Sequence, residues 1–404
     1  MTVRRVKLGE LFRIGSSKRV LQSQWKTEGV PFYRGREITR LAENGFVNNE
    51  LFISEELYSE YRSKSGVPVT GDIMITAIGT IGNSYVVRED DRFYFKDASV
   101  LWLHRTSDVS SEFINYWLKS PLFLEQVDRG NGATVDTLTI QKLQSVEISV
   151  PSFPEQRRIV AVLDEAFEGI ATAKANAEKN LQNARSVFDV HLQSVFGQRD
   201  EGWEETTLEK VLAVQPQNGW SPPAANHADN GTPVLTLSSV TGFQFRPEKI
   251  KFTSAPTNAG RNYWVKNGDF LITRSNTPEL VGHVAIAAGI NRPTIYPDLI
   301  MRMNPAPDRL MTEFLYFQLR TVTLRKEIMS RAQGANPTMK KISNSAVRTL
   351  SIVVPPITVQ REVVEILSGL ESAVRRLESV YERKLAALDE LKKSLLHQAC
   401  SGQL

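Results

Sequence analysis

The sequence has 404 residues, of which 41% are hydrophobic and 23% charged, and its formal net charge is +4. A single core rarely grows beyond ~250–300 residues, so we expect two or more domains of ordinary globular composition. The lone cysteine, Cys400, excludes a disulfide framework, and no stretch reaches the ~20 apolar residues of a membrane span. We therefore expect a cytoplasmic protein with no membrane partner.

Residues 1–150 carry short β-rich runs that Gly, Asn and Pro interrupt, as in a mixed α+β domain. The clearest runs are 67–69, 72–78 and 83–88. Gly79–Gly82 lacks the Lys-Ser/Thr pair of a phosphate-binding loop, so we interpret it as a turn that links two strands. A helix is predicted over Ser111–Val127.

A long helix is predicted next. After Pro151 and Pro154, apolar or small residues recur in steps of four and three from Ile159 to Val195, the spacing of one helix face. An ordinary core helix also carries such an apolar face. The predicted helix is ~40 residues long, however, against ~10–14 for a typical globular helix, and this length favours pairing with a second long helix.

The following segment repeats the first. Gly268–Thr273 matches Gly71–Thr76, and Glu313-Phe314-Leu315 matches Glu112-Phe113-Ile114. Strands are expected at 234–237, 270–273 and 284–287, and a helix at 312–329. Because the matches keep one order and nearly one offset, we conclude that the chain is duplicated.

A second long helix follows Pro355 and Pro356, with its apolar series from Val363 to Ala399 offset by 204 residues from the first. The first long helix leads from the first domain to the second, so the second long helix must run back toward the first domain in order to pair with it. The sequence thus predicts an α+β fold with two duplicated mixed α/β domains separated by two long antiparallel helices, a coiled coil with a pseudo-twofold axis. The predicted boundaries are 1–151, 152–198, 199–355 and 356–404.

Catalytic constellations are missing from the sequence. The five histidines are dispersed, no strand carries the carboxylates and lysine of a nuclease, and no Asn-Pro-Pro-aromatic motif of adenine methylation occurs. We predict no catalytic residue and no metal ligand, and hence a non-catalytic protein. Residues 198–354 hold 18 Lys and Arg against 13 Asp and Glu, which weakly favours a polyanionic partner.

Several segments together resemble a known family. They are Lys7–Phe12, Val30–Gly35, Gly71–Thr76 with Gly79–Asn83, Gly130–Thr134, Val150–Val160, Gly268–Arg274, Pro355–Arg361 and Ser394–Leu404. Over essentially its full length the chain resembles the specificity subunits of type I restriction–modification enzymes. It departs from the pattern before Gln360, where the acidic residue that precedes Gln156 has no counterpart.

The resemblance implies two target-recognition domains, 1–151 and 199–355, that read a bipartite site in double-stranded DNA. It also implies two methyltransferase subunits on the long helices, with restriction subunits as optional further partners. S-adenosylmethionine belongs to the methyltransferase, so this chain needs no cofactor. Two alternatives stay open: the recognition half of another restriction–methylation assembly, and a coiled-coil scaffold without a DNA role.

Candidate DNA-reading residues lie in loops that match between the halves. Arginine pairs with guanine edges, and Asn or Gln with adenine. The candidates are Tyr33, Arg34, Arg36, Asn131 and Thr134 in the first domain, and Arg274, Ser275, Asn276, Gln333, Asn336 and Lys340 in the second. The alternative is that these are ordinary surface loops.

Candidate partner-binding residues open the two long helices. They are Gln156 and Arg157 in the first helix, and Gln360 and Arg361 in the second. The resemblance implies partner contacts here. The alternative is that these side chains cap the start of each helix.

Overall fold

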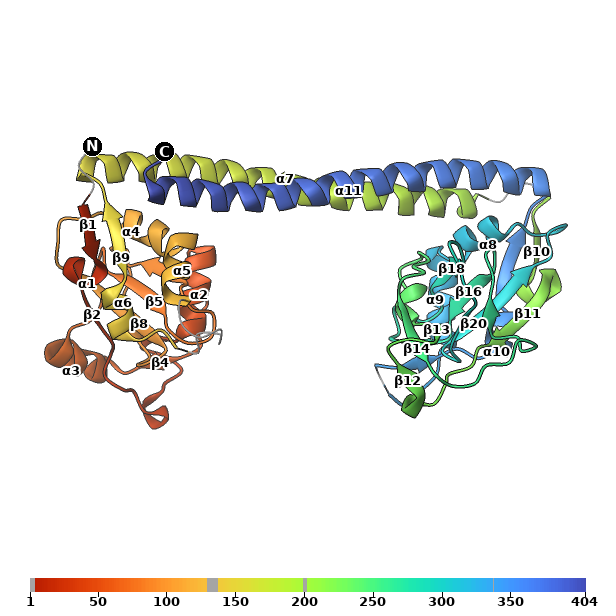
Figure 1. Cartoon of the computed structure of the whole chain (residues 1–404), viewed down its shortest axis with the longest axis horizontal. Helices are drawn as coiled ribbons and strands as arrows, with labels where there is room; N and C mark the ends of the chain where they lie inside the picture. The colour runs from red at the N-terminus through yellow and green to blue at the C-terminus, as the bar shows by residue number, and fades with distance from the viewer. Residues whose placement is uncertain (1–3, 129–136, 199–201, 337) are drawn as a thin grey trace. The chain divides into compact units, whose positions relative to one another are not determined.

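The computed structural model describes residues 4–128, 137–198, 202–336 and 338–404 (Figure 1). The chain divides into two compact units. One comprises residues 1–178 with 382–404, and the other comprises residues 179–381. Each unit contains one α+β domain and part of both long helices, so each is described separately.

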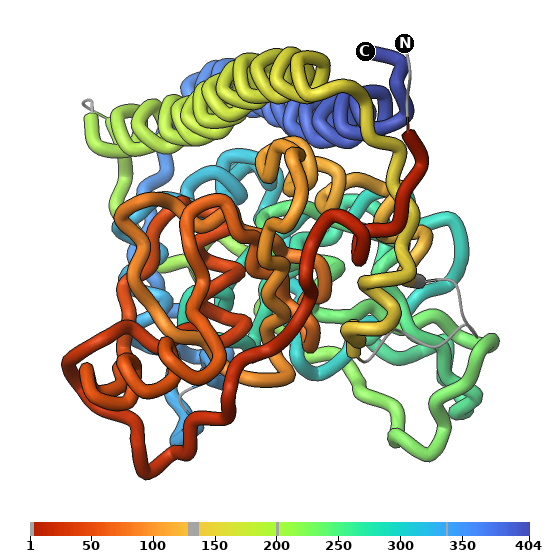
Figure 2. The backbone as a smooth tube through the Cα atoms, turned by 90° about the vertical axis from the view of Figure 1, so that its left-hand side faces the viewer, coloured from red at the N-terminus to blue at the C-terminus, as the bar shows by residue number. Residues whose placement is uncertain are grey.

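The first domain is built on a four-stranded antiparallel sheet of order β2-β8-β5-β6, with a three-stranded sheet of order β4-β3-β7 beside it. A separate two-stranded sheet, in which β1 pairs with β9, joins the two ends of the domain (Figure 2). The strands are β1 (Arg4–Lys7), β2 (Phe12–Gly15), β3 (Val30–Tyr33), β4 (Phe52–Ile53), β5 (Ile73–Thr76), β6 (Ser84–Val86), β7 (Tyr94–Phe95), β8 (Val100–Arg105) and β9 (Glu147–Val150). The helices are α1 (Leu8–Leu11), α2 (Gly35–Asn44), α3 (Glu55–Ser65), α4 (Ser111–Leu118), α5 (Pro121–Asp128) and α6 (Ile140–Ser145).

The second domain repeats this plan. Its sheet β11-β20-β16-β18 corresponds strand for strand to β2-β8-β5-β6, and β10-β22 corresponds to β1-β9. The strands are β10 (Glu204–Thr207), β11 (Leu212–Asn218), β12 (His227–Ala228), β13 (Thr232–Leu235), β14 (Ile250–Thr253), β15 (Trp264–Val265), β16 (Phe270–Thr273), β17 (Ser275–Asn276), β18 (Val284–Ile286), β19 (Thr294–Ile295), β20 (Ile300–Pro305), β21 (Lys340–Lys341) and β22 (Ser351–Val354). The α-helices are α8 (Thr312–Gln318), α9 (Val322–Arg331) and α10 (Asn344–Arg348). The duplication is confirmed.

A buried aspartate explains the repeated Gly-Asp motif. Asp72 accepts hydrogen bonds from Trp102 Nε1 at 2.7 Å and from the Val69 amide at 2.9 Å. Asp269 likewise accepts from the Lys266 amide at 2.8 Å and from Asn304 Nδ2 at 2.9 Å. The preceding glycines have φ of 85° and 91°, a left-handed conformation that favours glycine. The motif therefore closes a turn onto the central sheet.

Three predictions of local structure were wrong. The helix expected over 111–127 is two helices, because Pro121 has no amide hydrogen and disfavours a helical residue before it. In the second domain the break falls before Thr321, whose side chain caps α9 by accepting from the Leu324 amide. Residues 67–69 form no strand.

The long helices are α7 (Phe153–Gly197) and α11 (Ile357–Ser401), each of 45 residues. In the first unit Lys174 pairs with Asp389, and Arg158 Nη2 donates to the Leu404 carbonyl at 2.8 Å. Since residue numbers rise on one helix as they fall on the other, the helices are antiparallel, as predicted. In the second unit Arg185 pairs with Glu378 at 2.8 Å.

Each domain core includes residues from the far end of a long helix. Leu396, Ala399 and Cys400 of α11 lie in the core of the first domain. Ala184, Phe188 and Leu192 of α7 lie in the core of the second. The long helices are therefore integral to both domains.

Candidate nucleic-acid interface

A short strand ladder brings together candidate residues that are far apart in the sequence of the second domain. β17 pairs antiparallel with β21, so that Asn276 lies opposite Lys340 and Ser275 opposite Lys341. Gln333 joins the same ladder, because its backbone exchanges two hydrogen bonds of 2.8 Å with Lys341. The ladder continues from the end of the central strand β16, so these side chains are presented from a rigid sheet.

Arg274 links this ladder to the domain. Its guanidinium donates to the Asp298 carbonyl at 3.3 Å and lies 3.9 Å from the Asp298 carboxylate, while 27% of the side chain stays exposed. Asn276 lies beside it and donates through Nδ2 to Thr241 Oγ1 at 3.4 Å. Both side chains are thus held in place and only partly covered, as a preorganised contact requires.

Ser275 has the opposite orientation. It is 1% exposed, and its buried hydroxyl has no partner among the described residues. Alternate residues of a strand face opposite sides, so Ser275 points inward between Arg274 and Asn276. This burial argues against a direct DNA contact by Ser275.

The described residues between Gln333 and Lys340 bond to one another through their polar groups. Asn336 Oδ1 accepts from the Thr338 amide at 2.9 Å, and Lys340 Nζ donates to the Gly334 carbonyl at 2.7 Å. A Cβ on Gly334 would lie 2.9 Å from the Met339 carbonyl oxygen, so only glycine fits there. Gln333 and Asn336 are exposed in this arrangement.

The first domain has the same convergence of segments. The turn between β5 and β6, interpreted above as strand-linking, meets the strand-like residues 137–138, and Leu138 donates to the Ala77 carbonyl at 2.7 Å. The start of α2 lies against the end of β5, since a Cβ on Gly35 would approach Thr76 to 3.8 Å. The predicted residues Asn131 and Thr134 lie outside the described residues.

The arginines at the start of α2 bind carboxylates of their own domain. Arg34 donates through Nε and Nη2 to the two oxygens of Glu37, and Arg36 donates to Glu37 and Glu50 at 2.9 and 2.8 Å. Although burial alone would raise it, these hydrogen bonds lower the pKa of Glu37 to about 2. Arg34 therefore clamps the helix start, whereas Arg36 remains 46% exposed.

Tyr33 is half-buried and stacks on Phe93 with ring centroids 4.7 Å apart. Burial, together with Asp91 and Glu37, raises the pKa of its hydroxyl. The ring therefore packs within the domain and supports the start of α2, with only part of its surface available to a ligand.

The glutamines that open the long helices are buried. Gln156 accepts from the Ser110 amide and donates to the Pro151 carbonyl, both at 2.8 Å. Gln360 accepts from the Met311 amide and donates to the Pro355 carbonyl, again both at 2.8 Å. Neither glutamine caps a free amide in the described part of its long helix, so the capping alternative does not describe them. Each ties the proline that precedes its long helix to the residue directly before α4 or α8, which is a structural role, and the signal for it was the repeated spacing from proline to glutamine. Arg157 and Arg361 are exposed.

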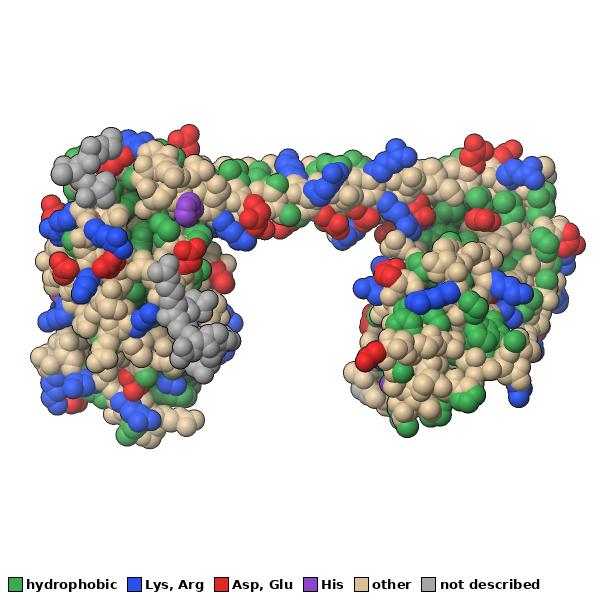
Figure 3. All heavy atoms as spheres, viewed as in Figure 1, with side chains coloured by type: hydrophobic (Ala, Val, Ile, Leu, Met, Phe, Trp, Pro, Cys, Tyr) green, Lys and Arg blue, Asp and Glu red, His purple; other side chains and the backbone are tan. Residues whose placement is uncertain are grey.

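The charged surface alone does not locate an interface. Figure 3 shows Lys and Arg side chains mixed with Asp and Glu over both domains. Within the described ranges, no group of three His, Cys, Asp or Glu side chains could hold a metal ion. No described helix is long and apolar enough to cross a membrane.

The comparisons with known proteins agree with this fold. The chain is 24% identical over 310 residues to the Type I restriction enzyme EcoKI specificity subunit of Escherichia coli, covering 73% of this chain and 66% of that subunit. It is 19% identical to the Type I restriction enzyme MjaVIII specificity subunit of Methanocaldococcus jannaschii, covering 88% of each chain. A relative from Haemophilus influenzae is 28% identical over 192 residues. The chain spans 47% of the Haemophilus relative's length and 66% of the EcoKI subunit's.

Two solved structures share the whole architecture. One, from a study of complex assembly and conformational transition of a type I R-M system, has a TM-score of 0.79 at 20% identity, covering 100% of this chain and 98% of that one. The HsdS subunit from Thermoanaerobacter tengcongensis has a TM-score of 0.59 at 19% identity, covering 100% and 97%. The family model described as the Type I restriction modification DNA specificity domain matches residues 2–182 and 200–382. The chain therefore belongs to the family of type I restriction modification DNA specificity proteins.

Proposed function

We propose that this chain is the DNA-specificity subunit of a type I restriction–modification enzyme and reads a bipartite target in double-stranded DNA. The observation that carries the proposal is the duplicated convergence of segments at the end of the central strand, β5 in one domain and β16 in the other. The second convergence presents Asn276, Gln333 and Lys340 on its ladder, and the first lies beside Arg34 and Arg36 at the start of α2. Such groups read base edges and neutralise phosphates.

The two domains share their core and differ at this edge. The first places the 10-residue helix α2 beside the convergence, where the second has the 3₁₀ helix Leu237–Ser239. Base contacts depend on which side chains reach the groove, so different edges favour different half-sites. The target is therefore expected to be asymmetric.

The long helices are proposed to bind two methyltransferase subunits. They expose large apolar side chains, at 55% for Val187 and 47% for Leu391. These two residues occupy equivalent positions in α7 and α11, as expected if each helix binds one copy of the same partner. The exposed Arg157 and Arg361 add equivalent cations near the helix starts.

The chemistry belongs to those partners in this proposal. The methyltransferase binds S-adenosylmethionine and methylates adenine N6, and a restriction subunit joins where the system has one. This chain supplies recognition and positioning without catalysis, in the cytoplasm where the DNA is.

Arg274→Ala tests the site. The complex should still assemble, while methylation at the cognate sequence should fall at least tenfold, because a well-placed arginine contributes ~1–3 kcal/mol of base discrimination. Lys210→Ala, which removes an exposed cation beside the β10–β22 pair, should leave methylation unchanged. Unaltered specificity in the Arg274 variant would reject this residue as a reader.

The scaffold alternative makes a different prediction. A specificity subunit with its methyltransferase should be retained on DNA at low salt and released as salt rises, because phosphate contacts displace counterions. A scaffold without a DNA role should show no retention at any salt concentration.

A further inference from the structure

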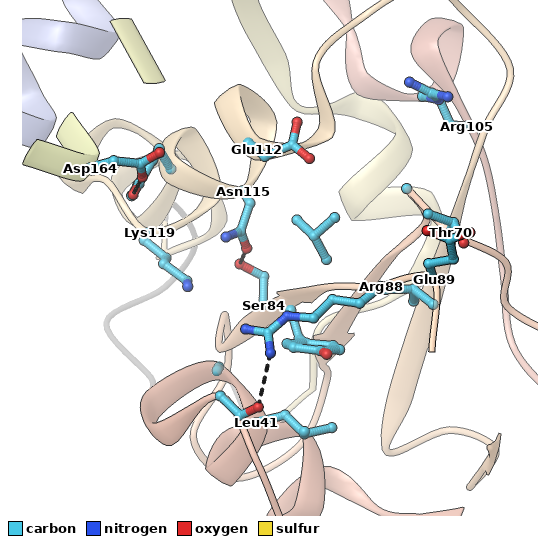
Figure 4. A pocket seen from close by; sticks show the side chains of 17 residues that line it. Leu41, Thr70, Ser84, Arg88, Glu89, Arg105, Glu112, Asn115, Lys119 and Asp164 are labelled. Atoms are coloured by element: carbon cyan, nitrogen blue, oxygen red, sulfur yellow. Dashed lines mark hydrogen bonds between the residues drawn. The ribbon is translucent and has the colours of Figure 1, made fainter. Parts of the chain in front are cut away.

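A cavity of 680 Å³ lies in the first domain between β6, α4 and the first turns of α7. Figure 4 shows the side chains of Arg88 and Lys119 extending toward one another across this space, with Ser84 and Asn115 between them. Glu112 and Arg105 lie at another side of the cavity. The lining thus carries three cations and the three carboxylates of Glu89, Glu112 and Asp164, and two of the cations, Arg88 and Lys119, extend toward one region.

Lys119 is the unusual member of this group. The residue is half-buried, and its side-chain ammonium group has no hydrogen-bond or ion-pair partner within the part of the chain that the structure describes. Burial and the nearby Lys392 lower the pKa of its ammonium group to about 8. A desolvated cation without a counter-ion is unfavourable, so the ammonium group of Lys119 lacks a neutralising partner.

The neighbouring groups add donors. The guanidinium of Arg88 donates through Nη1 to the Gly45 carbonyl at 3.2 Å and lies over the Tyr85 ring, and it has no carboxylate partner among the described residues. Asn115 accepts the Ser84 hydroxyl at 2.7 Å through Oδ1, which leaves its amide nitrogen to donate. The lining carboxylate of Asp164 is already bound by the Tyr116 hydroxyl, and Glu112 accepts from Ser110 Oγ at 2.8 Å.

The second domain provides an internal comparison. Arg320 holds the position of Lys119, since each follows the start of its helix, α8 or α4, by the same number of residues. Arg320 pairs at 2.6 Å with Glu371 of α11. The position of Glu371 in α7 is Phe167, and the position of Arg88 in the second domain is Ala288.

The two copies therefore differ in how this cation is compensated. In the second, Arg320 pairs with the carboxylate of Glu371 on the long helix. In the first, the long-helix carboxylate in the cavity, Asp164, binds the Tyr116 hydroxyl, and Arg88 adds a further cation. The volume of the cavity lies within the ~300–1,000 Å³ of small-molecule sites.

We propose that the first-domain cavity binds a phosphate group, either as free phosphate or on a mononucleotide, through Lys119, Arg88 and the Asn115 amide. Phosphate fits because its oxygens can accept from several donors at once and its charge compensates both cations. The ligand would bridge α4 and β6 and so brace the part of the domain that packs on α7.

Isothermal titration calorimetry on the full chain tests this site, with inorganic phosphate and adenosine monophosphate as probes at fixed ionic strength. We expect saturable binding, at least tenfold weaker in Lys119→Met and in Arg88→Met and retained in Lys119→Arg. Lys96→Met, at an exposed lysine of the same domain, is the matched control and should bind as the wild type does. Methionine keeps the aliphatic stem and removes a desolvated charge, so Lys119→Met should fold normally.

Tighter binding of adenosine monophosphate than of phosphate would identify a nucleotide as the source, and equal binding would identify free phosphate. No binding of either probe to the wild type would overturn the proposal. So would equal affinity in the wild type and both methionine variants.

Discussion

The most informative single residues are those that the duplication repeats. Asp72 and Asp269 are buried, and each joins a turn to the neighbouring strand. Their recurrence is architectural, so a repeated polar residue is not by itself evidence for a binding site. Gln156 and Gln360, at the starts of the long helices, are likewise repeated residues whose side chains make structural hydrogen bonds.

Asp269→Ala should destabilise the second domain by ~3–5 kcal/mol, because it leaves Arg302, a mostly buried cation 3.4 Å away, without its carboxylate. Chemical denaturation measures the change. Asp229→Ala, at an exposed position, is the control and should lie within ~0.5 kcal/mol of the wild type. A similarly small effect for Asp269→Ala would show that the carboxylate does not hold the turn.

His283 should make the second domain acid-sensitive. Burial, with Arg325 and Arg320 nearby, lowers the pKa of its imidazole to about 4. The ring stacks on Phe243 at 4.1 Å, and its Nδ1 accepts the Gly242 amide at 2.9 Å, a bond that only the unprotonated nitrogen can make. The unfolded chain therefore binds more protons between pH 6.5 and 4. Stability is complete above pH ~6.5 and falls by up to ~3 kcal/mol as pH decreases through that window.

His283→Asn keeps an acceptor for the Gly242 amide and removes the titration. The free energy of unfolding, measured from pH 7 to pH 4, should lose this part of its slope in the variant. An unchanged slope would mean that other groups cause the acid sensitivity.

The candidate site could be predicted from the sequence only in part. Matching loops between the halves located Asn276 and Lys340, which the structure brings onto one ladder, and Arg274, which lies directly before it. The sequence could not show that Ser275 points inward or that Glu37 binds Arg34, because both depend on which face of an element meets the core. Tertiary partners decide whether an arginine is available to a ligand.

At the scale of elements, strong periodicity was the reliable guide. The long helices follow from an apolar series that persists over many turns, and connectivity alone made them antiparallel. The helix breaks before Pro121 and Thr321 were missed, because one apolar pattern continues across both. The strands of the β4-β3-β7 sheet, and of the five-stranded sheet β12-β14-β13-β19-β15 in the second domain, have too few residues to show a clear alternation.

The far end of α11 should stabilise the first domain. Leu396 is buried in that domain's core, so Leu396→Ala should cost ~2–5 kcal/mol of its stability, measured by chemical denaturation. Leu391→Ala on the same helix is the matched control, since Leu391 is 47% exposed and should contribute less than ~0.5 kcal/mol. Equal effects would show that the helix end does not complete the core. If the partner proposal is right, only Leu391→Ala should weaken binding of the methyltransferase.

For the whole molecule, the duplication is the central fact. Each half contributes one sheet-based domain and one long helix, and each domain core takes residues from the far end of a long helix. Two similar domains with different edges suit a protein that reads two unlike half-sites. The family model agrees with this arrangement, because it matches the chain twice, once over each half.

Exchanging residues 204–354 for the corresponding segment of a relative tests this account most directly. Both segment ends lie in the β10–β22 pair, so the exchange replaces one domain and keeps both long helices. Sequencing of methylated adenines in cells that carry the hybrid should show a bipartite motif with one half retained and the other replaced. A motif that changes in both halves, or in neither, would contradict the proposal that each domain reads its own part of the target.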